Sequence, residues 1–194
     1  MAKADQILNS VYTYLNIQGS TEEQKYNRIN DIVLRLQRIN QQNNINVKTT
    51  GTISERLCEL ALKAKVQGYS RITEDWNWMA DFSLLGKPFN LLISVKSFKA
   101  KERLLVSGSG NILSPSVGWG LFNDITEWTV DRVSAYLYRG FIGIYMPSNL
   151  YNKLSPAAKR IKNINSKPLL RKVENFMRDL DRALEDNKIN IVAF

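Results

Sequence analysis

Apolar residues recur at helical spacing over the first third of the chain. This spacing predicts three helices, over residues 4–15, 22–42 and 53–65. Ser20 or Thr21 is placed to cap the second helix, and the polar stretch 43–51 is expected to be a connection without regular structure. The chain therefore begins with a largely helical region.

The pattern then changes to that of strands. A short strand over 69–73 is predicted to lead into a hairpin about residues 86–89, in which Leu84 pairs with Leu91. This register gives the hairpin one continuous apolar face, with Phe82 opposite Ile93 and Ala80 opposite Val95. This register is expected to bury the aliphatic residues of the hairpin.

The opposite face of the same hairpin is polar. Successive side chains of a strand point to opposite faces, and side chains on paired residues lie about 5 Å apart. The register therefore places Asp81 directly opposite Ser94, with Lys96 one diagonal step away. An acid, a hydroxyl and an ammonium group are expected to meet in one patch.

The remainder of the chain alternates between helix and strand patterns. Residues 107–123 are rich in glycine, serine and proline and are interpreted as a long ordered loop. Further elements are predicted as follows: a helix over 125–138 capped by Asp124, an apolar strand over 141–146, a helix beginning at Ser155-Pro156, a helix over 167–185 and a final strand over 189–194. The sequence thus indicates a mixed α/β (α+β) fold, with a small mixed central sheet flanked by helices.

Composition limits the chemistry that this fold can support. The chain has 194 residues, no histidine and a single cysteine, which excludes serine–histidine triads, histidine zinc sites and disulfide frameworks. Lys and Arg exceed Asp and Glu by 27 to 18, a net charge of +9 that favours a polyanionic partner. A charge that only maintains solubility is the alternative. The chain shows neither a membrane span nor a signal peptide, so a cytoplasmic protein is expected.

The polar patch has the groups that phosphodiester hydrolysis requires. Mg²⁺ binds oxygen ligands and keeps several waters, so one or two carboxylates are sufficient to hold it. A lysine beside the cation can orient water and offset the charge that develops on the phosphate. Asp81 followed by Lys96 on the next strand resembles the motif of the PD-(D/E)xK nuclease superfamily, and type II restriction endonucleases in particular.

The resemblance covers about residues 51–147 and implies a restriction-endonuclease-like core. It implies Glu55, Asp81, Ser94 and Lys96 as catalytic residues, and Asp81, Glu55 and Val95 as the metal-binding residues for Mg²⁺. Ser94 stands where the family has a second acid. Candidates to replace that acid are Glu55, Glu59, Glu102, Asp124 and Glu127, with Glu55 ranked first. DNA contacts are assigned to Lys99, Lys101, Arg103, Ser107, Ser109 and Asn111.

The predicted catalytic residues, and the 107–123 loop, can also be explained by purely structural roles. Glu55 lies three residues after Thr52 and is placed to complete a capping box. Asp81 is alternatively a solvent-facing strand acid, and Lys96 a residue that protects an edge strand. Ser94 is equally consistent with ordinary sheet packing, and the 107–123 loop with a packed surface loop.

The combined pattern predicts a Mg²⁺-dependent, sequence-specific endonuclease of double-stranded DNA that acts as a homodimer. One domain is expected, with a helical extension at 1–48, a catalytic core at 51–147 and C-terminal helices and a final strand at 148–194. The dimer contact is assigned to the helices at 22–42 or 167–185. Two alternatives remain: a non-catalytic DNA-binding protein that retains a nuclease fold, and a repair or junction-resolving nuclease.

Overall fold

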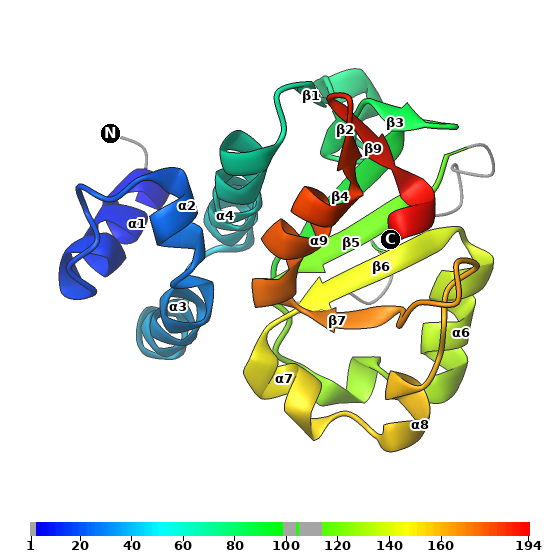
Figure 1. Ribbon diagram of the computed structural model, residues 1–194. Coiled ribbons are helices and arrows are strands. Elements are labelled where there is room, and N and C mark those ends of the chain that lie inside the picture. Colours follow the sequence, from blue (N-terminus) through cyan, green and yellow to red (C-terminus); the bar gives the residue numbers. More distant parts are fainter. Residues whose placement is uncertain (1–2, 99–103, 105–113) are drawn as a thin grey trace.

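The computed structural model describes residues 3–98, 104 and 114–194 as a mixed α/β fold. A central sheet has the strand order β1-β2-β4-β5-β6-β7, and helices flank it (Figure 1). Its strands are β1 (Tyr69–Arg71), β2 (Phe82–Leu84), β4 (Leu91–Lys96), β5 (Ser116–Gly120), β6 (Phe141–Met146) and β7 (Leu170–Lys172). The expectation of a mixed central sheet flanked by helices is confirmed.

The sheet changes direction at β4. Strands β1, β2 and β4 pair antiparallel, whereas β4, β5, β6 and β7 pair parallel. A second, smaller sheet has the order β3-β9-β8, formed by β3 (Gly86–Lys87), β9 (Lys188–Asn190) and β8 (Leu184–Glu185). The end of the chain therefore returns to the hairpin in the middle of the sequence.

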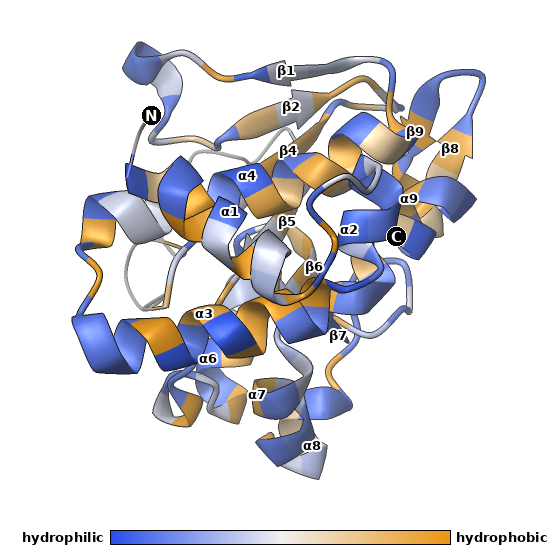
Figure 2. Ribbon diagram, turned by 90° about the vertical axis from the view of Figure 1, so that its left-hand side faces the viewer, coloured by the Kyte–Doolittle hydropathy of each residue, from blue (hydrophilic) through white to orange (hydrophobic). Residues whose placement is uncertain are grey.

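Helices lie on both faces of the sheet (Figure 1). Those of the N-terminal region gather on one side: α1 (Lys3–Tyr14), α2 (Glu22–Tyr26), α3 (Ile29–Asn43) and α4 (Val47–Lys65). On the other side lie α6 (Val130–Tyr138), α7 (Ser148–Lys153) and α8 (Pro156–Lys159), while α9 (Phe176–Ala183) packs against α4. Figure 2 shows apolar and polar residues alternating along α3 and α4, as expected for helices with one buried face.

Several predicted elements are confirmed. The helix over 4–15 corresponds to α1, and the strands over 69–73 and 141–146 correspond to β1 and β6. The hairpin register is as predicted, with Phe82 paired to Ile93 and Leu84 to Leu91. Thr21 caps α2, because its hydroxyl accepts a hydrogen bond from the Gln24 amide.

Two predictions in the N-terminal region are wrong. The helix over 22–42 is broken between Tyr26 and Ile29. Both residues are fully buried, so the apolar pattern runs through the break and does not reveal it. The stretch 43–51 is an irregular connection only over residues 44–46, because Asn46 caps α4 through the Thr49 amide at 2.8 Å and the helix begins at Val47.

The predicted loop over 107–123 contains a central strand of the sheet. Every residue of β5 is buried between β4 and β6. A Cβ atom at Gly120 would come within 2.7 Å of the Lys96 carbonyl oxygen and 2.5 Å of the Phe122 ring. Glycine is therefore required here by close packing, whereas the composition suggested a loop.

The C-terminal region differs most from expectation. Residues 167–185 form strand β7, a 3₁₀ turn at Val173–Asn175 and the short helix α9, instead of one long helix. The predicted helix over 125–138 begins as a 3₁₀ turn at Ile125–Glu127, and α6 starts at Val130. The final strand β9 ends at Asn190, before a 3₁₀ turn at Ile191–Ala193. Because β7 pairs with β6, this region belongs to the main sheet and is not a helical addition to it.

Candidate functional site

The hairpin brings Asp81 and Lys96 together at one end of β4. Asp81 precedes β2, and its amide still pairs with the Ile93 carbonyl at 2.9 Å. Its Oδ2 atom then accepts a hydrogen bond from the Val95 amide at 2.6 Å, in the place where a backbone carbonyl would continue the ladder. The same Oδ2 lies 3.5 Å from Lys96 Nζ. The carboxylate thus binds β4 at the start of β2 and contacts the lysine at the same time.

This ion pair is sheltered but remains accessible. The side chains of Asp81 and Lys96 are 20% and 11% exposed. They line a cavity of about 190 Å³, called here the site cavity. Its lining residues are Val47, Gly51, Glu55, Asn77, Asp81, Val95, Lys96 and Ser97. A pair that is partly shielded from water interacts more strongly than one on an open surface.

Glu55 reaches the same cavity from helix α4. Burial raises the pKa of Glu55 above its ordinary value, and the negative charge of Asp81 raises it further. Arg71 opposes this shift, with its Nη1 atom 3.3 Å from Glu55 Oε2, and so does the charge of Lys96. The two carboxylates are therefore close enough to repel each other.

The capping interpretation of Glu55 is wrong. Helix α4 begins at Val47 with Asn46 as its cap, so Glu55 lies more than two turns inside the helix. The Thr52 hydroxyl donates to the Lys48 carbonyl instead of capping a helix start. Glu55 therefore has no part in capping the start of α4.

The other candidates for the second acid, which is missing at position 94, either bind other groups, are buried or lie outside the described residues. Glu59 binds Arg71 with both carboxylate oxygens, at 3.1 and 2.9 Å. Burial alone would raise the pKa of Glu59, but the hydrogen bond and charge of Arg71 outweigh it, and the pKa is lowered. Asp124 caps a 3₁₀ turn through the Thr126 amide, and Glu127 is buried. Glu102 lies outside the described residues.

Ser94 and the predicted DNA contacts have different outcomes. Ser94 is buried, with 1% exposure, and is not among the residues that line the site cavity. The structure therefore groups Glu55, Asp81, Val95 and Lys96 without it. The predicted DNA contacts all lie outside the described residues: Lys99, Lys101, Arg103, Ser107, Ser109 and Asn111.

Two polar lining residues, and an arginine that binds Glu55, were not anticipated from the sequence. Asn77 and Ser97 line the site cavity, and Arg71 links Glu55 to Glu59 from strand β1. Asn77 and Ser97 lie close in sequence to Asp81 and Lys96, which is a weak local signal for them. The role of Arg71 depends on β1 lying beside α4, which no local pattern indicates.

The donor set of the site cavity suits Mg²⁺ better than a metal held entirely by protein. Among residues 3–98, 104 and 114–194, no group of three or more acids, histidines or cysteines is placed to hold a metal. Glu55 and Asp81 offer two carboxylates, and the Val95 carbonyl points to the same edge as its amide, which binds Asp81. Two carboxylates are enough for Mg²⁺, which retains waters. A cation between them would also relieve the repulsion that, together with the larger effect of burial, raises the pKa of Glu55.

Comparisons with known proteins give no evidence on function, so the functional argument rests on the geometry of the site cavity. No family model matches the chain, and searches of curated proteins and of solved structures return no match. Within the part of the chain that the structure describes, no helix is long and apolar enough to cross a membrane.

Proposed function

We propose that this protein is a Mg²⁺-dependent endonuclease that hydrolyses phosphodiester bonds of double-stranded DNA. The observation that carries the proposal is the shared cavity of Glu55, Asp81 and Lys96 at the end of β4. A sheet does not need two repelling carboxylates and a lysine at one strand end, because such groups lower its stability. Phosphodiester cleavage needs them, since it requires both a cation and a fixed positive charge.

The element order supports a restriction-endonuclease-like core. Helix α4 carries Glu55 and precedes the antiparallel hairpin of β2 and β4, and α6 and the apolar strand β6 follow. This is the order expected from the resemblance of the Asp81–Lys96 motif to the PD-(D/E)xK superfamily. Strand β5, inserted beside β4, is an element that the motif did not predict.

The proposed mechanism assigns a different task to each side chain. Glu55 and Asp81 would hold Mg²⁺, with the Val95 carbonyl on the same edge. When bound, Mg²⁺ neutralises charge on the phosphate and makes water a stronger nucleophile. Lys96 would place its ammonium group against the phosphate and stabilise the charge that develops there. Asp81, 3.5 Å from Lys96 Nζ, keeps that ammonium group in position.

Two tryptophans beside the site cavity support a nucleic-acid substrate. Trp76 and Trp78 are 57% and 48% exposed, and their ring centroids are 6.3 Å apart. Asn77, between them, lines the site cavity. Exposed aromatic rings stack on bases, and a chain with net charge +9 attracts the phosphate backbone. Double-strand cleavage by one site per chain calls for a homodimer.

A non-catalytic DNA-binding protein is the second candidate. The observation in its favour is that the described residues bring only two acids to the site cavity, with Ser94 in place of another. Its DNA binding would be independent of Mg²⁺. An intact ion pair between Asp81 and Lys96 favours the active enzyme over this candidate.

Plasmid DNA provides the first test. Incubation of the full chain with supercoiled plasmid and Mg²⁺ should produce linear DNA with discrete ends, which sequencing would map. EDTA and the Asp81→Asn variant serve as controls and should leave the plasmid supercoiled. Light scattering on the protein–DNA complex should give two chains per site. Binding without cleavage under every divalent cation tested would support the second candidate instead.

A further inference from the structure

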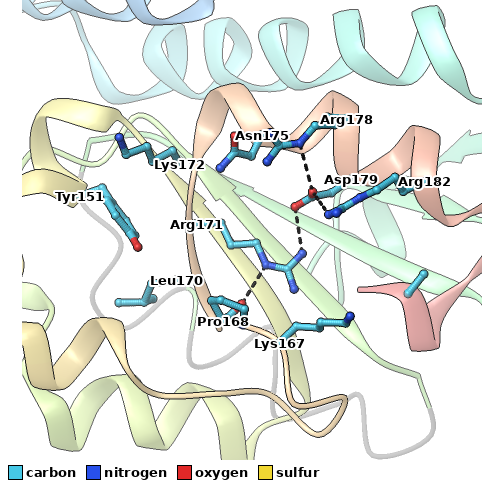
Figure 3. Close-up of a pocket in the computed structure, with 11 residues that line it drawn as sticks. Tyr151, Lys167, Pro168, Leu170, Arg171, Lys172, Asn175, Arg178, Asp179 and Arg182 are labelled. Carbon is cyan, nitrogen blue, oxygen red and sulfur yellow. Dashed lines mark hydrogen bonds and ion pairs between the residues drawn. The ribbon is translucent and has the colours of Figure 1, made fainter.

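A second pocket, separate from the site cavity, lies between strand β7 and helix α9 (Figure 3). Its volume is about 230 Å³. Five basic side chains and a single carboxylate line it: Lys167, Arg171, Lys172, Arg178, Arg182 and Asp179. We call it the basic pocket. Its lining charges sum to +4, because the one carboxylate faces five cations.

The inner wall of the basic pocket is rigid. The Arg171 side chain is 7% exposed, and its Nη1 atom lies 3.0 Å from Asp179 Oδ2. Its Nε atom donates to the Pro168 carbonyl at 2.8 Å, and Tyr145 donates to Asp179 Oδ2 at 2.8 Å. A charged group that is more than nine-tenths buried and bound on several sides keeps its orientation without a ligand.

Arg178 and Arg182 form the exposed rim of the basic pocket, and Asp179 only partly neutralises their positive charge. Arg178 and Arg182 are one helical turn apart on α9, and each side chain is 64% exposed. Arg182 Nη2 lies 2.7 Å from Asp179 Oδ1, and Arg178 Nε lies 4.0 Å from the same oxygen. Figure 3 shows that three arginines converge on this one carboxylate. Like charges at this helical spacing repel each other, and a bound anion would offset that cost.

We propose that the basic pocket binds a phosphate group. Guanidinium groups match phosphate because their donors form a planar fork that binds two oxygens at once. The amide of Asn175 lies beside Arg178 and adds a further donor, and Lys172 lines the pocket near Tyr151. The volume is below the range of about 300–1,000 Å³ of pockets for drug-sized ligands. It therefore suits one phosphate with a small substituent better than a large cofactor.

The basic pocket does not depend on the proposed nuclease site. Strands β5 and β6 separate β4, which carries Lys96, from β7. Three strand spacings correspond to about 14 Å across the sheet. None of the residues that line the site cavity lines the basic pocket. Phosphate binding can therefore be tested in the absence of Mg²⁺ and of any cleavage.

Calorimetric titration of the full chain with inorganic phosphate, at constant ionic strength, tests the proposal. We expect saturable binding at one site, and we expect Arg178→Gln/Arg182→Gln to weaken it by about tenfold or more, because charge-assisted bonds are lost. Arg38→Gln/Lys188→Gln removes the same charge from exposed positions outside the pocket and should bind like the wild type. Circular dichroism would confirm that both double variants are folded.

Competition identifies the source of the phosphate. A short DNA duplex that displaces inorganic phosphate from the wild type would assign the pocket to the DNA backbone. Undiminished phosphate binding in the presence of the duplex would assign it to a small phosphorylated molecule. The proposal is overturned if the wild type shows no saturable phosphate binding, or if the two double variants bind phosphate equally. None of these outcomes depends on nuclease activity, so a loss of cleavage in Asp81→Asn would leave the conclusions about phosphate binding unchanged.

Discussion

The site cavity and the basic pocket each contain an acid beside a base, but the two pairs are built differently. Asp179 is 5% exposed, and its oxygens are bound by Arg171, Tyr145 and Arg182. Asp81 is 20% exposed and lies near Glu55, whose pKa is raised by burial and by the charge of Asp81. A buried pair with its oxygens bound is part of the architecture. A partly open pair beside a second acid is suited to binding a cation and doing chemistry.

The largest effect is expected at the open pair. Asp81→Asn and Lys96→Ala should each lower cleavage by about 10³-fold or more, because several kcal/mol of transition-state stabilisation is lost. DNA affinity, measured by fluorescence anisotropy, should stay close to that of the wild type, since both residues act on the scissile phosphate. Full cleavage by either variant would contradict the assignment of the site.

Disrupting the buried pair of Arg171 and Asp179 should lower the stability of the folded protein. Asp179→Asn leaves the buried Arg171 charge without its main partner and should lower the free energy of unfolding by about 3–5 kcal/mol. Chemical denaturation monitored by circular dichroism would measure this loss. Arg182→Gln changes an exposed partner of the same carboxylate and should cost about 1 kcal/mol or less. Equal losses in both variants would show that the buried Arg171–Asp179 pair contributes no more to stability than the exposed Arg182 contact.

Glu55 and Glu59 provide a matched comparison on one helix, because both bind Arg71. Glu55→Gln should lower cleavage by about 100-fold, since it removes a proposed cation ligand, and change stability by less than about 1 kcal/mol. Glu59→Gln should cost about 1 kcal/mol of stability and leave cleavage near the wild-type rate. Normal cleavage by Glu55→Gln would move the second acid elsewhere, with Glu127→Gln as the next variant to assay.

The smallest effect is a dependence of Mg²⁺ stabilisation on pH. The pKa of Glu55 is raised in the folded state, so the folded protein binds this proton more tightly than the unfolded chain. The ionised carboxylate then costs no stability below its unfolded pKa, and the cost appears as the pH rises through the folded pKa. Bound Mg²⁺ should offset this cost. The Mg²⁺-induced rise in Tm should therefore grow as the pH rises from the ordinary pKa of a glutamate through the raised pKa of Glu55, and it should be reduced in Glu55→Gln.

Local patterns in the sequence were sufficient for the hairpin and its polar face. Period-two alternation and the need to bury Phe82 and Leu84 leave one register, which the structure has. That register places Asp81 beside Lys96, because an antiparallel hairpin brings together residues that are close in sequence. The position of Glu55 in the same cavity was implied only by the family resemblance, and the structure supplies its geometry through the packing of α4 on β4.

Tertiary packing decided the features that depend on residues distant in sequence. Strand β5 is a central strand only because β4 and β6 pair with it on both sides, and its glycines fit the space that these neighbours leave. Strand β7 likewise forms by pairing with β6 and not by any pattern of its own. The bonds of Arg171 to Asp179 and of Arg71 to Glu55 and Glu59 join separate elements. Periodicity reports which face of an element is buried, but it does not report which other element buries it.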